Sequence, residues 1–370
     1  MENDTIKVLH LDDAKGWRGG QQQAWYLVSA LVESGYTTRL VCQPNSTLAD
    51  RCLQGSVPFS PVRMHNELDF IAGWRVARIC RKQGFTLLHA HSAHALAIAI
   101  WARMFNASLK VVAARRVDFS VRKSPISVWK YKNGFVDKIV CISEAVKKVL
   151  LKDGIPVEKL TTINDGIDLY KFKHVRVNPE FRERMGIPAD HFIVGTVAAL
   201  VGHKDYPNLL RAAKRVIERH DQVTFLAVGN GKDEMKLKEL AADLALGERF
   251  IFAGYRNDVG PFLRAFDLFV AASKKEGLGT SVLDALAAGL PVVGTRAGGI
   301  PESVQDGLNG LLVPVQNPEA LAGAILDLIN QPQLRQKMSR LAPESVAPFS
   351  IENIVRQTIT LYREICAEHT

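Results

Sequence analysis

The residues from Asp267 to Val304 read DLFVAASKKEGLGTSVLDALAAGLPVVGTRAGGIPESV, and this stretch decides the fold. Two short apolar runs, 267–272 and 291–295, are typical of strands buried in a parallel sheet. The residues between them favour a helix from Ser281 onward. A strand, a helix and a second strand in succession indicate one unit of a parallel sheet covered by helices.

A glycine-rich bend at 277–280 joins the first of these strands to the helix. The first N–H groups of a helix lack partners within it and, with the positive end of the helix dipole, they favour a diphosphate. Glu276 precedes the bend, and Asp284 is expected in the first turn of the helix, where a carboxylate suits paired sugar hydroxyls. The residues expected to contact the ligand at the bend are Gly277, Leu278, Gly279, Thr280 and Ser281. An N-cap beside a solvated acidic residue is the alternative interpretation, and a second glycine turn at 297–302 argues against it.

This segment resembles the retaining glycosyltransferases of family four, whose motif is a glutamate, seven residues and a second glutamate. Here Asp284 takes the second place. The resemblance implies that Glu276 holds sugar hydroxyls and that Asp284 holds the ribose of the nucleotide. It extends over nearly the whole chain, through a Gly-Gly loop at 19–20, a His-x-His at 89–91 and a linker similar to Asn-Gly-x-Asp.

Short β-type runs alternate with amphipathic segments along both halves of the chain, which predicts two doubly wound parallel sheets. In the first half the predicted strands are 6–11, 38–43, 86–90, 110–113 and 138–142, and the clearest helices are 23–34 and 70–83. In the second half the predicted strands are 192–200, 223–229, 250–253, 267–272 and 291–295. The linker is expected between Asp168 and Asp190, where the periodicity fades, and a last helix is expected from Ser350 to Glu368.

The α/β architecture that the resemblance implies is GT-B, two Rossmann-like domains facing a cleft that holds the active site. Residues 1–175 are expected to form an acceptor-binding domain, and residues 176–348 a nucleotide-sugar donor domain. Residues 349–370 are expected to return to the first domain as a helix. In such sheets, ligands bind beyond the carboxyl ends of the strands.

Lys204 follows the first strand of the second domain and precedes an expected helix start at Asp205 and Pro207. A lysine there can neutralise charge on a leaving diphosphate, whereas a solvated lysine is the alternative interpretation. The family usually has an arginine five residues earlier, where this chain has Ala199. Lys204 is therefore expected to act alone or with another cation, such as His203 or an arginine of the first domain.

Two further turns follow strands of the second domain. Gly229 and Asn230 form a tight turn that lets the backbone approach a ligand. Tyr255 and Arg256 stand where, in the family, the main chain hydrogen-bonds the base. The alternatives are a simple turn at the first position and two surface side chains at the second.

The first domain offers a glycine pair and three histidines. Gly19 and Gly20 allow the backbone to approach a reacting centre, and a flexible loop is the alternative. By resemblance His91 is the active-site histidine, where a neutral imidazole can accept a hydrogen bond from a sugar hydroxyl. His94 is a second candidate. Zinc at His89, His91 and His94 is disfavoured because no matching cysteine or acidic pair stands nearby, so no metal is expected.

The chain has 370 residues, of which 47% are hydrophobic, enough for two cores. Its five cysteines are scattered and show no Cys-x-x-Cys spacing, which predicts neither a disulfide framework nor a zinc site and fits a reducing compartment. The N-terminus is acidic and then strand-like, unlike a secretory signal, and no apolar run approaches the roughly 20 residues that span a bilayer. We expect a cytoplasmic protein, soluble or peripheral on the inner face of the membrane.

The net charge of +9 is concentrated in the first half of the chain. Residues 1–185 hold 28 basic against 17 acidic side chains (+11), and residues 186–370 hold 19 against 21 (−2). A basic half indicates an anionic partner, such as a membrane surface or a lipid-linked or phosphorylated acceptor, although a solvated charge run is the alternative. The residues expected on this acceptor or membrane surface are Arg115, Arg116, Arg122 and Lys123, with Trp129 and Tyr131 interleaved.

The sequence therefore predicts an enzyme that moves a sugar from a nucleoside diphosphate to a hydroxyl of a glycan or lipid-linked acceptor, of the cell-surface polysaccharide or lipopolysaccharide type. By resemblance the reaction retains the anomeric configuration and needs neither a cofactor nor a metal. A nucleotide-sugar epimerase of the same fold is the nearest alternative. A basic nucleic-acid-binding protein is a weaker one, since no RNA- or DNA-binding signature is present and no nucleic-acid partner is expected.

Overall fold

The computed structural model describes residues 6–367, except for the side chain of Lys123. The chain forms two compact units. Unit 1 comprises the residues up to Gly166 together with those from Phe349 onward, and unit 2 comprises Ile167–Pro348. The boundary thus lies between Gly166 and Ile167, before the predicted residue 175.

Unit 1 is built on a seven-stranded parallel sheet with the strand order β3-β2-β1-β4-β5-β6-β7. Its strands are β1 (Lys7–Asp12), β2 (Thr37–Cys42), β3 (Phe59–Pro61), β4 (Leu87–Ala90), β5 (Lys110–Arg115), β6 (Lys138–Cys141) and β7 (Leu160–Thr162). The helices between them are α1 (Gly19–Glu33), α2 (Thr47–Gln54), α3 (Phe70–Gln83), α4 (Ala93–Phe105), α5 (Pro125–Lys132) and α6 (Glu144–Lys152). Strands and crossover helices alternate, as a doubly wound sheet requires.

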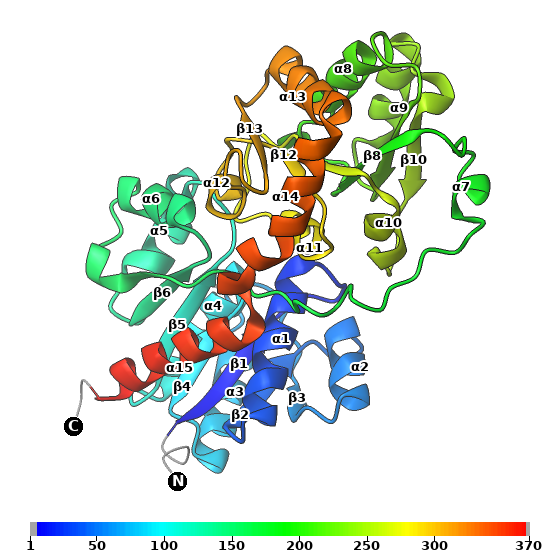
Figure 1. The fold of residues 1–370 in the computed structure, drawn as a ribbon. Helices are drawn as coiled ribbons and strands as arrows, with labels where there is room; N and C mark the ends of the chain where they lie inside the picture. Colours follow the sequence, from blue (N-terminus) through cyan, green and yellow to red (C-terminus); the bar gives the residue numbers. More distant parts are fainter. Residues whose placement is uncertain (1–5, 368–370) are drawn as a thin grey trace. The chain divides into compact units, whose positions relative to one another are not determined.

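The last helix, α15 (Ile351–Ala367), belongs to unit 1 although unit 2 separates it from the rest of that unit in sequence. It lies beside α1 and across the strands β1 and β4 (Figure 1). Ile354, Ile359 and Tyr362 of α15 pack with Leu27 of α1 and Leu87 of β4 in one apolar core. Glu368, the predicted end of this helix, lies outside the described residues.

Unit 2 has a six-stranded parallel sheet with the order β10-β9-β8-β11-β12-β13. Its strands are β8 (Phe192–Val197), β9 (Val223–Val228), β10 (Phe250–Gly254), β11 (Leu268–Ala271), β12 (Val292–Thr295) and β13 (Gly310–Val313). Its helices are α7 (Phe181–Arg184), α8 (Tyr206–Ile217), α9 (Glu234–Asp243), α10 (Gly260–Ala265), α11 (Thr280–Ala287), α12 (Ile300–Ser303), α13 (Pro318–Asn330) and α14 (Pro332–Ser345). The core between α8, α13 and the sheet contains Leu209, Val216 and Ile325.

The prediction of two doubly wound parallel sheets is confirmed. All ten predicted strands are present, and helix α3 has the predicted bounds. The first helix begins at Gly19, four residues before its predicted start, because nothing in the glutamine-rich segment that follows disfavours a helix. Within the described residues, no helix is long and apolar enough to cross a bilayer.

Candidate functional site

In unit 2, the glycine bend lies between the end of β11 and the start of α11. Gly279 is the N-cap of α11 with a φ of +89°, a left-handed conformation that glycine adopts without strain. No side chain caps the helix, so the first N–H groups of Thr280 and Ser281 are directed beyond the helix end. The structure thus forms the turn and the uncapped helix start that the sequence predicts for residues 277–281.

The second glycine turn supports the backbone of Glu276. The Gly299 N–H donates to the Glu276 carbonyl oxygen at 3.2 Å. Gly298 has a φ of +49°, and a Cβ atom there would lie 1.7 Å from the same oxygen. Because a Cβ has no room at Gly298, the two turns can pack together only when this residue is glycine.

The Glu276 carboxylate forms an ion pair with the Lys204 ammonium and also accepts a hydrogen bond from the Ser273 hydroxyl at 3.1 Å. Lys204 lies at the end of the short 3₁₀ turn Gly202–Lys204, immediately before α8. Both side chains are mostly shielded from solvent, and with Ser281 they line one small pocket. The structure therefore brings together the acid, the cation and the helix start that were predicted to hold a donor.

Asp284 lies on α11, but not in its first turn as predicted. The helix begins at Thr280, so Asp284 is its fifth residue. Its Oδ2 atom lies 3.6 Å from the Lys171 ammonium, and its side chain is 18% exposed. Burial raises the pKa of Asp284, and the nearby Lys171 opposes that rise.

The helix start at Asp205 is confirmed, with a φ of +52° at this N-cap and proline in the first turn. Ala199 lies in the loop that follows β8, and its carbonyl accepts a hydrogen bond from the Val201 N–H. The loop that contains Ala199 is followed closely in sequence by Lys204, and this lysine forms the ion pair with Glu276.

The turn at Gly229 and Asn230 packs against the protein's own backbone. Gly229 has a φ of +146°, and a Cβ there would lie 2.1 Å from the Ala198 carbonyl oxygen. The Asn230 carbonyl accepts from the Leu200 N–H at 2.9 Å. Glycine is thus required here by the adjoining loop, whatever ligand the turn also meets.

Tyr255 and Arg256 follow β10. The Tyr255 side chain is 52% exposed. Arg256 is exposed as well, and its guanidinium lies over the Phe262 ring at 5.7 Å. The structure places both residues on the surface after a strand of unit 2, and a role in holding the base remains a prediction.

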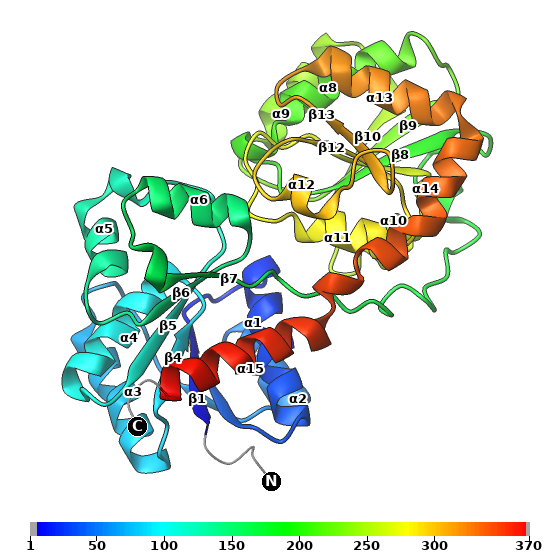
Figure 2. The ribbon, with the colours of Figure 1, turned by 60° about the vertical axis from the view of Figure 1, so that its left-hand side comes forward.

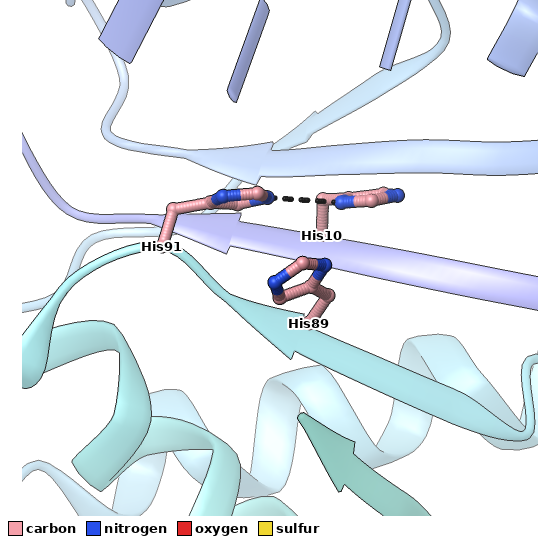
Figure 3. Close-up of side chains that lie close together, drawn as sticks. All are labelled: His10, His89 and His91. Atoms are coloured by element: carbon pink, nitrogen blue, oxygen red, sulfur yellow. Dashed lines mark hydrogen bonds between the residues drawn. The ribbon is translucent and has the colours of Figure 1, made fainter. Parts of the chain in front are cut away.

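In unit 1, three buried histidines gather at neighbouring strands. His10 of β1 and His89 of β4 are paired in register, and His91 follows two residues after His89 on the same side of the sheet. Figure 3 shows the His10 and His91 rings joined by a hydrogen bond with the His89 ring beside them. His89 Nδ1 is 2.6 Å from the hydroxyl of Tyr362, which comes from α15.

Arg116 determines which nitrogen of His91 carries the proton. Burial lowers the pKa of all three histidines, to about 3 for His10, so the rings are neutral at pH 7. The pKa of Arg116 is lowered by burial to about 10, so its guanidinium stays charged and can only donate, here to His91 Nδ1 at 3.4 Å. His91 must then carry its proton on Nε2, which donates to His10 Nδ1 at 2.9 Å.

Both ring nitrogens of His91 thus have protein partners in this structure, and the hydrogen bond from a sugar hydroxyl to this residue stays a prediction. The His91 side chain is 3% exposed. His91 lies at the carboxyl end of β4 as predicted, and its hydrogen-bond partners there are Arg116 and His10.

The ring nitrogens of His10, His89 and His91 lie within 4.8 Å of one another, close enough to consider a metal. A divalent cation there would face the Arg116 guanidinium, with no carboxylate among the three ligands to offset its charge. The arrangement fits a hydrogen-bonded network better than a metal centre.

Other polar groups surround the same edge of the sheet. His94 donates from Nδ1 to Asp13 at 2.9 Å, which raises the pKa of His94. Gly20 belongs to the first turn of α1 with Gly19, and a Cβ at Gly20 would touch the Arg116 side chain at 3.7 Å. The glycine pair thus brings the uncapped start of α1 close to Arg116, in place of the flexible loop considered as the alternative.

The prediction that Arg115 and Arg116 lie on an acceptor or membrane surface is wrong. Strand β5 continues to Arg115, whose guanidinium is turned inward and donates to the Phe119 carbonyl and to Tyr131. Arg116 forms an ion pair with the buried Asp165. Arg122 is exposed as predicted, and the side chain of Lys123 lies outside the described residues.

Several residues that complete these sites were not singled out from the sequence. They are Lys171 and Ser273 in unit 2, and His10, Asp165 and Tyr362 in unit 1. His10 lies in the predicted strand 6–11, and the pairing of β1 with β4 places it beside His89. No local pattern marks Lys171 or Tyr362, which reach their partners through the tertiary fold.

The sequence matches the family described as Glycosyl transferases group 1 over residues 177–345, and Glycosyltransferase Family 4 over residues 17–171. It is 35% identical over 357 residues to the lipopolysaccharide core biosynthesis glycosyltransferase LpsE of Rhizobium meliloti (strain 1021), a match that covers 94% of this chain and 96% of that protein. It is also 32% identical over 218 residues to the D-inositol 3-phosphate glycosyltransferase of Corynebacterium urealyticum, which covers 56% of this chain and 51% of that protein.

Among solved structures, HepE from Anabaena in complex with UDP-glucose superimposes with a TM-score of 0.85 at 22% identity, covering 97% of this chain and 100% of that one. That likeness, together with the two parallel sheets, shows a GT-B fold. The relatives over nearly the full length of the chain are named enzymes of sugar transfer. The chain is therefore a glycosyltransferase and belongs to group 1, family four, of these enzymes.

Proposed function

We propose that this enzyme transfers a sugar from a nucleoside diphosphate to a hydroxyl of a lipid-attached glycan, with retention of the anomeric configuration. The observation that carries the proposal is the Lys204–Glu276 ion pair beside the uncapped start of α11. One ligand can meet both charges there, with its sugar hydroxyls at the carboxylate and its phosphates at the ammonium and the helix amides. The UDP-glucose bound by HepE and the lipopolysaccharide core made with LpsE support this donor and acceptor class.

In the proposed reaction the bond between the anomeric carbon and the diphosphate oxygen breaks as the carbon becomes oxocarbenium-like. Lys204 and the N–H groups of Thr280 and Ser281 stabilise the negative charge that develops on the leaving diphosphate. The acceptor oxygen bonds to the anomeric carbon on the face that the diphosphate leaves. Its proton passes to the departing phosphate oxygen, so the reaction needs neither a protein nucleophile nor a protein base.

Glu276 and Asp284 would orient the donor rather than attack it. Glu276 lies at the sugar side of the pocket, where Ser273 and Lys204 fix its carboxylate. Asp284 lies about one helical turn beyond the start of α11 and would accept hydrogen bonds from the ribose hydroxyls once Lys171 moves aside. We propose that the reaction takes place at the cytoplasmic face of a membrane, without a metal or other cofactor.

The test begins with a thermal-shift screen of nucleoside-diphosphate sugars, because a ligand at 100 times its Kd stabilises a protein by about 2.7 kcal/mol. The donor found in this way is then incubated with lipid-attached glycan acceptors, and the anomeric configuration of the product is read by NMR. Glu276→Gln should lower kcat/KM at least about 100-fold with an unchanged melting temperature. Glu319→Gln is the matched control, since Glu319 is a 77% exposed acid of the same unit.

Three outcomes would each contradict a different part of the proposal: the stereochemistry, the role of Glu276, or the type of reaction. An inverted product would exclude retention, and full activity in Glu276→Gln would exclude the role of that carboxylate. Isomerisation of the donor in the absence of acceptor would favour the epimerase alternative. None of the relatives reported above is an epimerase or a nucleic-acid-binding protein.

A further inference from the structure

One side of unit 1 exposes large apolar side chains. It is formed by α3, α4 and α5, which follow one another in contact along the sheet (Figure 2). The residues that define this apolar face are Leu68, Phe70, Ile71, Trp74, Ile126 and Trp129, with exposures from 43% to 70%. A patch of this kind marks an interaction surface more often than a freely solvated one.

The exposed side chains surround a groove. Leu68 before α3, Trp101 of α4, and Ile126 and Trp129 of α5 line it together, and it has a volume of about 80 Å³. Trp101 also joins the groove to α3, because α3 packs so closely on α4 that a Cβ at Gly73 would lie 2.4 Å from the Trp101 Cβ. Side chains from three helices therefore form one continuous face.

The charged residues of α3, α4 and α5 are all basic, and the one acid that lines the groove, Glu67, forms an ion pair with Lys130. Helices α3, α4 and α5 contain no aspartate or glutamate, and their basic residues are Arg75, Arg78, Arg81, Lys82, Arg103, Lys130 and Lys132. Of the other helices of this unit, α2 and α15 carry both signs, and the only charged residue of α1 is Glu33. On α3, Arg75, Arg78 and Lys82 are exposed, and the Arg78 guanidinium lies over the Trp74 ring at 5.5 Å.

We propose that the apolar face docks this enzyme on an anionic lipid bilayer. The Ile126 and Trp129 side chains would enter the boundary between head groups and acyl chains, where the amphipathic indole ring is favoured. The arginines of α3 would remain level with the phosphates, each contributing about 1 kcal/mol near an anionic surface. A second copy of the chain is a poorer occupant, because it would bring the same acid-free basic helices together.

This inference adds a surface to the proposed function and differs from the surface that the sequence suggested. In the basic run from Arg103 to Lys138, Arg115 and Lys130 are buried, and Arg116 is mostly shielded and paired with Asp165. Arg122 stays exposed, and so does the apolar side of α5, which lies on the same side of the unit as α3, a helix that the charge count did not single out.

The test is cosedimentation of the full chain with vesicles of phosphatidylcholine alone or mixed with phosphatidylglycerol. Wild type should bind the anionic vesicles at low salt and progressively less as salt rises. The double variant Ile126→Glu with Trp129→Glu should reduce the bound fraction at least about tenfold. Arg75→Gln with Lys82→Gln should weaken binding and flatten its salt dependence.

Matched controls place the same charge on other exposed apolar residues. Leu53→Glu lies on α2, and Met235→Glu lies on α9 of unit 2, with exposures of 68% and 75%. Both should bind vesicles as wild type does. The proposal fails if wild type does not bind, if the double variant binds normally, or if the controls lose as much.

Two further readouts separate the explanations. If light scattering finds a dimer that the double variant converts to a monomer, the apolar face is a self-association surface and the lipid assignment is wrong. Stabilisation by a nucleoside-diphosphate sugar should be equal in the double variant and wild type, because both substitutions lie outside the donor unit. If no nucleoside-diphosphate sugar stabilises the wild-type protein, the proposed function is refuted, and the vesicle result still stands by itself.

Discussion

The Lys171 ammonium lies 3.6 Å from the Asp284 carboxylate, across 113 residues of sequence. Asp284 is the acid proposed to receive the ribose, so lysine and ligand compete for the same oxygens. Partly exposed ion pairs are weak, which makes this one easy to displace. Lys171→Ala should therefore tighten nucleoside diphosphate binding about two- to fivefold, as measured by calorimetry.

A control for this effect is Lys173→Ala, which removes a neighbouring charge of the linker that forms no ion pair among those found in the described residues. Weaker binding in Lys171→Ala would show that Lys171 contacts the phosphates, and would make it the cation that compensates for Ala199.

The second prediction concerns the positive charge of Lys204, which is proposed to neutralise the leaving diphosphate. Lys204→Ala should lower kcat/KM about 100-fold, a loss of roughly 2.7 kcal/mol of transition-state stabilisation. Adding Ala199→Arg should recover part of that loss if a guanidinium in the loop after β8 reaches the same phosphates. Near-normal kinetics in Lys204→Ala would mean that another cation neutralises the leaving group.

Gly298 should be indispensable for a reason of packing. In Gly298→Ala the new Cβ would collide with the Glu276 carbonyl, so we expect unit 2 to lose about 3 kcal/mol or more and donor binding to fall with it. Gly307→Ala is the matched control, since Gly307 also has a positive φ, +80°, but open space around its Cβ position. That variant should lose about 1 kcal/mol. Equal melting temperatures for the two variants would refute the steric argument.

The three neutral histidines make the stability of unit 1 depend on pH. Their pKa values are lowered in the folded chain, so the unfolded chain binds more protons below about pH 6.5 and stability falls as pH falls, for His10 down to about pH 3. Each contributes up to about 1.4 kcal/mol per pH unit. His94 has a raised pKa and acts in the opposite direction.

Hydrogen exchange followed by mass spectrometry can read this effect in unit 1 separately from unit 2. His10→Gln keeps an acceptor for His91 and should remove about one third of the slope between pH 6.5 and pH 5. An unchanged slope would show that His10 does not contribute to the pH dependence.

The sequence predicted the central strands well and the edges of the sheets poorly. Strands such as Val223–Val228 are continuous apolar runs because both faces of a parallel sheet are covered. The missed strands β3, β7 and β13 are all at sheet edges and have three or four residues, too short for a periodicity to appear.

The candidate site divides in the same way. Glu276, the glycine bend and Lys204 were found because each follows a strand or begins a helix, which local pattern reveals. Lys171 and Tyr362 were missed because their contacts depend on where distant segments come to rest. Arg115 was misjudged because a count of charges ignores which side of a strand each residue faces.

Helix α15 determines when the first-made half of the chain can finish folding during synthesis. The 17 residues of α15 leave the ribosome after the whole of unit 2, yet they supply Ile354 and Tyr362 to the core around Leu27. Unit 2 is continuous in sequence and can fold as soon as it emerges, whereas unit 1 keeps apolar surface open until the last helix arrives. A chain that stops short of α15 would leave this surface uncovered, which gives chaperones and proteases a direct means of recognising an unfinished copy.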